Sequence, residues 1–314
     1  MKIVFLDAKT MGDIPNMHLI SELGEFTLYS TTRPEEAADR LKDADIAITC
    51  KVVFDRLLIK QLPLLKLICV AATGMNNVDV DYARSAGIQI KNVPNYSTNN
   101  VTQVTFAMLL ALLNQTNYYD QYVKSGEYTQ NDMFTHIGKT TYELAGKRYG
   151  IIGLGNIGRK VASIAEAFDC EVCYFSTTGK NKNPAYEKME LDSLLKVSDI
   201  VSIHANLNDN TRNLITYEKL KLMKTNAILL NMSRGGIVNE ADIARALNEN
   251  LIAGAAFDVF SKEPVEKTNP LLSINNPEKI ILSPHSAWTS IDARTRLIAM
   301  VAENIKEFQK GNSH

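Results

Sequence analysis

Short apolar runs alternate with amphipathic segments along the first third of the chain. Segments 17–24 and 33–44 have helical periodicity, and Pro34 with the acidic residues after it suits the start of a helix. Five apolar runs around these segments have the length of buried strands, at residues 2–8, 25–30, 45–50, 65–73 and 87–94. Alternating strands and helices predict a parallel sheet covered by helices.

The pattern changes at residue 99, where one long helix is predicted over 99–126. Its early part, from Val101 to Leu113, is apolar around much of its circumference. A helix of that kind is buried, either in a core or against another subunit. Of the two interpretations we favour a subunit contact.

A second alternating block runs from residue 146 to residue 311. Its apolar runs predict strands at 147–155, 170–176, 200–207, 226–233, 252–260 and 279–285. The segments between them lie at 156–169, 191–199, 217–225 and 239–251, and 290–311 is a closing amphipathic helix. No low-complexity linker and no simple repeat interrupts the chain, which therefore holds two α/β units.

Composition agrees with two domains and narrows the partners. The chain has 314 residues, 45% of them hydrophobic, which supports a sizeable core. The net charge of −1 gives no reason to expect nucleic acid as a partner. The apolar run at the N-terminus is too short for a signal peptide, and no run is long enough to span a membrane. We expect a cytoplasmic protein without a membrane partner.

Cys170 and Cys173 form a C-x-x-C pair, which redox or metal sites also use. No second pair or nearby histidine completes a zinc site. The pair straddles the start of a strand, so we favour free, packed thiols and expect no metal.

Gly153, Gly155 and Gly158 form a G-x-G-x-x-G motif directly between a predicted strand and a predicted helix. That context is typical of dinucleotide binding: the first glycine permits a sharp turn, the second lets the pyrophosphate approach, and the third lets helix and strand pack closely. The helix dipole and the free N–H groups at its start favour phosphate. We therefore predict a dinucleotide cofactor.

The next strand ends at Ser176, where the dinucleotide motif has an acidic residue for the ribose hydroxyls. A carboxylate would repel the 2′-phosphate of NADP, whereas Thr177, Thr178 and Lys180 could bind it. We favour tolerance of NADP, with NAD close behind.

Three later strands end in polar residues. Arg234 follows one strand, Asp258 and Glu263 follow the next, and His285 follows the last. An arginine at the carboxyl end of a strand points into the ligand crevice of such sheets and suits a carboxylate. A histidine there can exchange a proton near neutral pH, and a nearby glutamate would stabilise its charged form.

Four segments together resemble the D-isomer-specific 2-hydroxyacid dehydrogenase family. They are GIIGLGNIG at 150–158, NMSRGGIVNE at 231–240, AAFDVFSKEP at 255–264 and LSPHSAW at 282–288. The resemblance covers nearly the whole chain. The STTGKN turn at 176–181 and the tryptophan after His285 look closest to the glycerate dehydrogenase and hydroxypyruvate reductase branch.

The resemblance implies two Rossmann-like, doubly wound parallel-sheet domains with a cleft between them. Residues 1–98 and 287–314 would form the substrate-binding domain and residues 99–286 the dinucleotide-binding domain. The family is usually dimeric, so a homodimer is implied.

The resemblance also implies a role for each matching residue. His285 would be the acid/base, Glu263 its partner, and Arg234 the residue that holds the substrate carboxylate and polarises its carbonyl. Backbone amides around Thr73 and Gly74 would bind the same carboxylate, and Asp258 would contact the nicotinamide carboxamide. We expect the remaining cofactor contacts at Asn156, Ile157, His204, Ala205, Asn206, Met232 and Ser233.

Two assignments stay open from the residues alone. His204 lies at a strand end and is either a cofactor contact or structural, and Trp288 lines the substrate pocket or packs at the domain interface. The implied activity is the NAD(P)-dependent interconversion of a small 2-oxo acid and its D-2-hydroxy acid, with hydroxypyruvate or glyoxylate favoured. The alternatives are a 3-phosphoglycerate dehydrogenase and a nucleotide-sensing protein related to corepressors.

Overall fold

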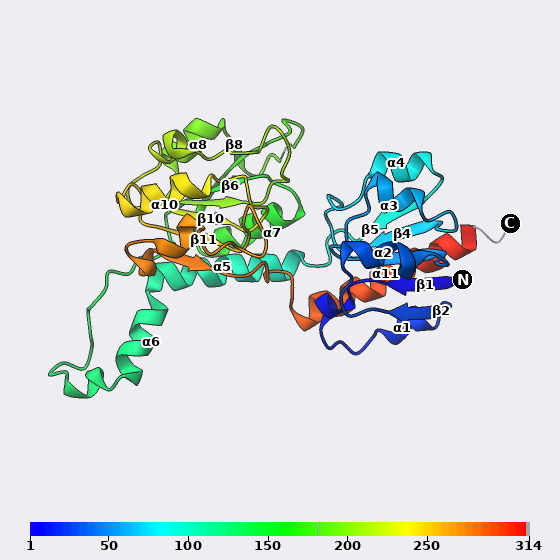
Figure 1. The fold of residues 1–314 in the computed structure, drawn as a ribbon. Coiled ribbons are helices and arrows are strands. Elements are labelled where there is room, and N and C mark those ends of the chain that lie inside the picture. The colour runs from blue at the N-terminus through cyan, green and yellow to red at the C-terminus, as the bar shows by residue number, and fades with distance from the viewer. Residues whose placement is uncertain (182, 312–314) are drawn as a thin grey trace. The chain divides into compact units, whose positions relative to one another are not determined.

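The computed structural model describes residues 1–181 and 183–311 and divides into two units. Unit 1 comprises Met1–Ser97 and Trp288–His314, and unit 2 comprises Thr98–Ala287. The chain therefore leaves unit 1 after residue 97 and re-enters it at residue 288. Figure 1 shows this in its colours, since the red C-terminal helix lies with the blue and cyan N-terminal elements.

Unit 1 is built on a five-stranded sheet in which every pairing is parallel, with strand order β2-β1-β3-β4-β5. The strands are β1 (Lys2–Phe5), β2 (Glu25–Leu28), β3 (Ile46–Thr49), β4 (Leu67–Val70) and β5 (Gln89–Asn92). Around them lie η1 (Ala8–Met11), α1 (His18–Ser21), α2 (Pro34–Leu41), α3 (Arg56–Lys60), α4 (Val80–Ser85) and α11 (Ile291–Gly311). All five predicted strands of this block are present.

Both faces of the unit 1 sheet are covered by apolar side chains. Along β1, Ile3 and Phe5 belong to one core and Val4 to another, as the period of two in a strand requires. The first core also contains the buried stripe of α11, and the second contains Leu41 of α2. The unit is therefore doubly wound.

Unit 2 is built on a seven-stranded sheet with order β12-β11-β10-β9-β6-β7-β8, again with parallel pairings throughout. The strands are β6 (Arg148–Ile152), β7 (Glu171–Phe175), β8 (Glu187–Lys188), β9 (Ile200–Ile203), β10 (Ile228–Asn231), β11 (Gly254–Phe257) and β12 (Ile280–Leu282). The order reverses direction at the β6–β9 pair, as in dinucleotide-binding sheets, and ligands bind at the carboxyl ends of the strands at such a switch point.

Both faces of this sheet are covered by helices (Figure 1). The helices of unit 2 are α5 (Thr98–Asn114), α6 (Thr116–Lys124), α7 (Asn156–Ala167), α8 (Leu191–Val197), α9 (Tyr217–Leu220) and α10 (Glu240–Asn248), of which all but α6 bury side chains. Short 3₁₀ turns complete it, at η2 (Glu127–Gln130), η3 (Pro270–Ser273) and η4 (Pro277–Lys279). The fold class predicted from the sequence, two doubly wound α/β units, is confirmed.

The single helix predicted over 99–126 is wrong. The structure breaks it at Gln115, whose φ of 49° lies in the left-handed region, and the Gln115 side chain donates to the carbonyl of Leu112 at 2.8 Å. Apolar positions face the core only up to Leu113, and α6 buries no residue. The helix therefore ends where its buried stripe ends.

We predicted that the apolar part of this helix, Val101–Leu113, contacts another subunit. For its buried side chains that prediction is also wrong. Phe106, Leu109 and Leu112 of α5 pack in the core of unit 2 itself, against α7 and the sheet. Exposed apolar side chains lie further along the chain, after α6, where Phe134 is 93% exposed and Ile137 is 83% exposed. Figure 1 shows α6 and the segment after it extending away from the sheet of unit 2.

The four cysteines are free and buried, which confirms the packing interpretation of the C-x-x-C pair. The Cys170 thiol contacts the carbonyl of Leu144, and the Cys173 thiol lies 3.8 Å from the Ser198 hydroxyl. Among residues 1–181 and 183–311 no cluster of His, Cys, Asp or Glu could hold a metal ion. No helix in the same described part is long and apolar enough to cross a membrane.

Candidate active site

The three glycines of the motif form the turn from β6 into α7, and each has a different surrounding. Gly153 has a φ of 93°, and a Cβ there would lie 2.8 Å from the backbone nitrogen of Ala205. A Cβ on Gly158 would lie 2.3 Å from the carbonyl oxygen of Gly153. A Cβ on Gly155 would meet nothing within 4 Å. The first and third glycines are thus required by the protein's own packing, whereas the second borders open space.

The start of α7 fits the pyrophosphate of a dinucleotide. The helix begins at Asn156 after Gly155, which supplies no side-chain cap. The first-turn residues Asn156, Ile157 and Gly158 have backbone N–H groups that cannot bond within the helix. With the positive end of the helix dipole and the space beside Gly155, this is a cradle for negatively charged oxygens.

The turn after β7 holds the residues predicted to meet the adenosine ribose. Ser176 is 5% exposed, and its hydroxyl accepts the N–H of Asn181 at 3.3 Å, so it closes the turn. The Thr178 hydroxyl accepts the N–H of Lys180 at 3.3 Å. Thr177 is half-buried and Lys180 is exposed.

Asn181 in this turn was missed by sequence reasoning. Its side chain donates to the carbonyl of Leu154, within the glycine turn, at 3.4 Å. The two turns are thereby connected. Asparagine is so common in turns that its type alone gave no signal of this contact.

The strands β9 and β10 bring further predicted cofactor residues to the same edge of the sheet. His204 after β9 pairs through Nε2 with the Ser202 hydroxyl at 3.0 Å, while its buried Nδ1 has no hydrogen-bond partner among residues 1–181 and 183–311. Burial lowers the pKa of His204 to about 3, so this imidazole is neutral. Ala205 packs against the glycine turn, and Asn206 is exposed.

Met232, which follows β10, is 5% exposed and packs in the core, and its contact with the cofactor stays a prediction. The Ser233 hydroxyl contacts the carbonyl of Ala205. Arg234 comes next, half-buried, with one guanidinium nitrogen donating to the Ser233 carbonyl at 2.8 Å.

Asn231, the last residue of β10, shapes the loop that carries Arg234. It is 1% exposed, and its amide donates to the carbonyl of Arg234 at 3.0 Å and accepts the N–H of Ser233 at 3.2 Å. A buried amide at a strand end carried a signal in the sequence, because Asn often bonds the backbone of a following turn. No role was predicted for it.

Asp258 lies after β11 and is 2% exposed. Its carboxylate accepts the hydroxyl of Ser283 and the N–H groups of Ser286 at 2.8 Å and Ala287 at 3.0 Å. Its backbone carbonyl accepts the N–H of His285 at 2.7 Å. Burial raises the pKa of Asp258, and these hydrogen bonds oppose the shift. In this structure Asp258 supports the turn that carries His285.

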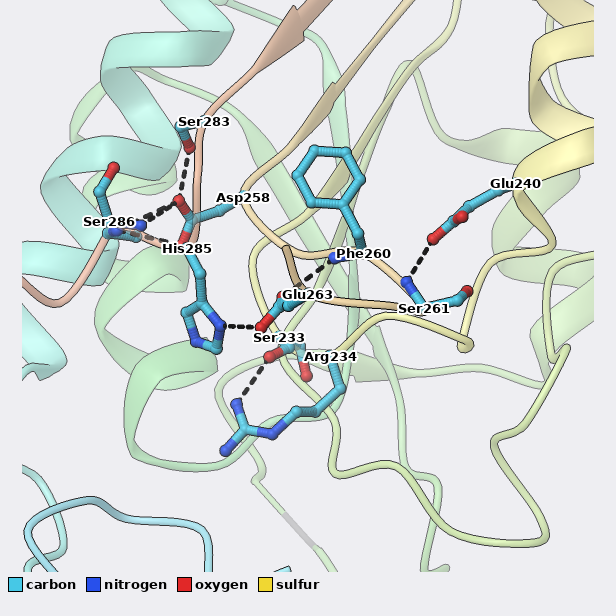
Figure 2. A network of polar contacts seen from close by, with 11 residues as sticks. Ser233, Arg234, Glu240, Asp258, Phe260, Ser261, Glu263, Ser283, His285 and Ser286 are labelled. Carbon is cyan, nitrogen blue, oxygen red and sulfur yellow. Dashed lines mark hydrogen bonds and ion pairs between the residues drawn. The ribbon is translucent and has the colours of Figure 1, made fainter. Parts of the chain in front are cut away.

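His285 faces Glu263 across the site (Figure 2). The imidazole Nδ1 lies 2.7 Å from Glu263 Oε2, and the two side chains are 22% and 30% exposed. The other carboxylate oxygen of Glu263 accepts the N–H of Phe260 at 3.1 Å. Because a carboxylate only accepts, this contact places a hydrogen on Nδ1 and leaves Nε2 to exchange a proton.

Arg234, Glu263 and His285 come from loops after β10, β11 and β12, which are neighbouring parallel strands. The structure therefore brings the three to one edge of the unit 2 sheet, the edge at which the glycine turn also lies. A fixed cation and a carboxylate-supported imidazole can together bind an anionic substrate and transfer a proton to or from it.

The substrate residues predicted in unit 1 are described within that unit. The Thr73 hydroxyl donates to the carbonyl of Val93 at 3.0 Å, so the loop of Thr73 and Gly74 after β4 is tied to the end of β5. Trp288 packs edge-on against Tyr96, with 6.1 Å between ring centroids, at the margin of the unit 1 core. Their part in substrate binding stays a prediction.

Comparison with known proteins identifies the family. The sequence pattern of the D-isomer specific 2-hydroxyacid dehydrogenase NAD binding domain matches residues 106–287. A hydroxypyruvate reductase of Blautia hydrogenotrophica is 36% identical over 322 residues, 99% of this chain and 98% of that protein. A glycerate dehydrogenase of Methylorubrum extorquens is 36% identical over 99% of this chain and 96% of its own length.

The chain belongs to the D-isomer-specific 2-hydroxyacid dehydrogenases. It is thus an oxidoreductase whose unit 2 contains the NAD-binding domain, and its cofactor is NAD or NADP. A solved structure of an acyclic imino acid reductase with NADPH and D-Arg has a TM-score of 0.87 and 29% identity, covering 99% of this chain and 98% of that one. The predicted family, fold and class of enzyme are confirmed.

Proposed function

We propose that this dehydrogenase interconverts a small 2-oxo acid and its D-2-hydroxy acid, with hydroxypyruvate as the favoured 2-oxo acid and glyoxylate next. The observation that carries the proposal is the 2.7 Å contact between His285 and Glu263 at the strand edge that also holds Arg234. The relatives named hydroxypyruvate reductase and glycerate dehydrogenase support the choice of substrate.

The residues divide the work of the reaction. His285 gives the proton of Nε2 to the keto oxygen in reduction and takes it back in oxidation, while Glu263 stabilises the imidazolium. Arg234 binds the carboxylate and polarises the carbonyl beside it. The nicotinamide, when bound, supplies the hydride that adds to the carbonyl carbon.

We extend the proposal to the two units. Unit 1 acts as the substrate-binding domain, in which Thr73, Gly74 and Trp288 contact the substrate, and unit 2 holds the dinucleotide. Each unit has its own parallel sheet with apolar cores on both faces, which supports the division into two domains.

The turn after β7 supports tolerance of NADP. No acidic residue occurs between Ser176 and Tyr186, so nothing in this stretch of sequence repels a 2′-phosphate. Lys180 is exposed beside it. The buried Ser176 hydroxyl already accepts a backbone N–H, which leaves Thr177, Thr178 and Lys180 as the candidates for that phosphate.

We also propose a homodimer, with the contact after α6 rather than on α5. Phe134 and Ile137 are almost fully exposed, and Met133 and Tyr142 are more than half exposed. Such a concentration of apolar side chains is typical of a surface that a second copy covers. Light scattering should give twice the chain mass of 34.9 kDa, and Phe134→Asp with Ile137→Asp should give the monomer. A monomeric wild-type protein would refute this contact.

One assay tests the function. Absorbance of the reduced dinucleotide is followed with hydroxypyruvate, glyoxylate and 3-phosphohydroxypyruvate, each with NADH and NADPH. We expect hydroxypyruvate to give the highest kcat/KM, and NADPH to be used at least as well as NADH. Faster turnover of the phosphorylated acid would point to a 3-phosphoglycerate dehydrogenase, and no turnover at all would favour a nucleotide-sensing protein.

His285→Ala is the decisive variant in that assay. Loss of the proton donor should lower kcat by about 10³-fold, since general acid–base groups contribute roughly 10² to 10⁴. Dinucleotide affinity should stay within about twofold, because the glycine turn is untouched. A variant that keeps most of kcat would remove His285 from the mechanism.

A further inference from the structure

Glu263 lies on a loop that is largely exposed to solvent. Between Ser261 and Thr268 every residue except Val265 is exposed. Glu263 nevertheless has to hold His285 at 2.7 Å, and its own carboxylate is oriented by the N–H of Phe260. The Phe260 N–H belongs to the Val259–Phe260 peptide, directly before the Phe260–Ser261 peptide, so the position of Phe260 decides where the Glu263 carboxylate lies.

Glu240, the first residue of α10, holds this loop at two points (Figure 2 shows the first). One carboxylate oxygen accepts the N–H of Ser261 at 2.5 Å, and the other accepts the side-chain amide of Asn269 at 2.7 Å. Asn269 in turn caps the 3₁₀ turn η3 by accepting the N–H of Leu271 at 2.9 Å. One carboxylate thus closes both ends of the loop that contains Glu263.

Glu240 is not needed to cap its own helix. Asn239 precedes it, and the Asn239 side chain accepts the N–H groups of Ala241 and Asp242, each at 3.1 Å. An acidic residue in the first turn commonly serves the helix N-terminus. Here that role is already filled, and the Glu240 carboxylate turns to the loop.

The Phe260–Ser261 peptide, which Glu240 holds, also supports the loop that carries Arg234. A Cβ on Gly235 would lie 1.9 Å from the carbonyl carbon of Phe260 and 2.3 Å from the nitrogen of Ser261. The Arg234 loop therefore packs directly on the Phe260–Ser261 peptide. Movement of this peptide would displace Arg234 and Glu263 together.

We propose that Glu240 is a positioning residue for the reaction, which sets the Glu263–His285 contact and the Arg234 loop by fixing the Phe260–Ser261 peptide. The inference rests on the proposed function, because it concerns the groups assigned to proton transfer and substrate binding there. It adds a residue that touches neither substrate nor dinucleotide.

The test compares two Glu→Ala variants from the same region. Glu240→Ala removes both anchors, whereas Glu266→Ala removes only an exposed pair with Lys262 in the same loop. We expect Glu240→Ala to lower kcat about tenfold, since small displacements of reacting groups are costly, and to keep the dinucleotide KM within about twofold. Glu266→Ala should match the wild type in both.

A second readout needs no turnover. The Hε1 resonance of His285, assigned by its loss in His285→Gln, should move in Glu240→Ala and stay in place in Glu266→Ala. If the wild type reduces none of the 2-oxo acids, the proposed function fails while this comparison still tests the positioning role. If Glu240→Ala matches Glu266→Ala in kcat and in the resonance, the positioning role is refuted.

Two milder variants, Glu240→Gln and Asn269→Ala, distinguish an effect on the position of the loop from an effect on folding. In Glu240→Gln the new amide oxygen can still accept the Ser261 N–H, but the second anchor is lost, so we expect a kcat between those of the wild type and Glu240→Ala. Asn269→Ala removes the same second anchor from the other side and should match it. Wild-type kcat and resonance in both folded variants would overturn the inference even if Glu240→Ala does not fold.

Discussion

Among the residues of unit 2 in the left-handed backbone region, Gly153 after β6 and His285 after β12 both lie at the site. Gly153 has a φ of 93° and no Cβ, and Ala205 occupies the space that a Cβ would need. His285 adopts a φ of 53° with a full side chain, a conformation uncommon for such residues. Its N–H is held by the carbonyls of Asp258 and Ser283.

The difference lies in what holds each turn. The glycine turn needs mainly the absence of side chains, at Gly153 where Ala205 lies close and at Gly158 where the Gly153 carbonyl lies close. The His285 turn depends on the Asp258 carboxylate, which is distant in sequence and accepts from Ser283, Ser286 and Ala287. The glycine turn can thus be recognised from a short sequence motif, whereas the His285 turn is held by polar contacts that the sequence around His285 does not show.

The largest effect should come from a matched pair within the glycine turn. Gly158→Ala places a methyl 2.3 Å from the Gly153 carbonyl, and we expect it to lower the free energy of unfolding by about 3 kcal/mol. Gly155→Ala meets no protein atom within 4 Å, so stability should hold while dinucleotide affinity falls about tenfold, or about 1.4 kcal/mol. Urea unfolding and dinucleotide titration measure the two.

Two results would contradict the expected difference between Gly155→Ala and Gly158→Ala. If Gly155→Ala bound the dinucleotide as the wild type does, the open space beside Gly155 would not be where the pyrophosphate binds. Equal loss of stability in both variants would show that both glycines serve packing alone.

Asp258 tests the other turn and separates two roles. Asp258→Ala removes the carboxylate that accepts the N–H groups of Ser286 and Ala287, so we expect kcat to fall about 10²-fold as the His285 turn loosens. Asp258→Asn, which keeps one acceptor oxygen, should lose less. The dinucleotide KM should change by less than about twofold in both.

The contact with the nicotinamide carboxamide expected from the family resemblance predicts the opposite outcome. Asp258→Asn would then raise the dinucleotide KM strongly and leave kcat nearly unchanged. Steady-state kinetics with varied dinucleotide therefore distinguishes support of His285 from contact with the cofactor.

The sequence predicted the elements and the strand-end residues because both are local signals. Strand length, helical periodicity and the glycine spacing can be read within a window of about 15 residues. The contacts of Asn181 and Glu240 could not be predicted, since each joins a side chain to backbone of a distant segment whose position depends on the fold. The long helix was wrong for a related reason, because the pattern did not show where burial stops after Leu113.

The smallest effect concerns the other strand-end histidine of unit 2, His204. An unfolded chain protonates His204 near pH 6.5, whereas the folded protein keeps it neutral down to about pH 3. Between these values the unfolded state binds the extra proton, so the stability that His204 contributes is complete above pH 6.5 and is lost as the pH falls toward 3. For a partly exposed ring we expect about 1 kcal/mol of loss between about pH 7 and pH 5.

His204→Gln should remove that part of the pH dependence of the urea midpoint, because glutamine has no proton to gain. Ser202→Ala is the matched control, since it deletes the 3.0 Å contact with Nε2 and keeps the imidazole, so it should retain the wild-type slope. A His204→Gln protein with the full wild-type slope would mean that His204 gains its proton in the folded protein at the same pH as in the unfolded chain. In that case the buried Nδ1 of His204 would have a hydrogen-bond partner. The contrast between His204, neutral beside the dinucleotide turn, and His285, which exchanges a proton, would no longer stand.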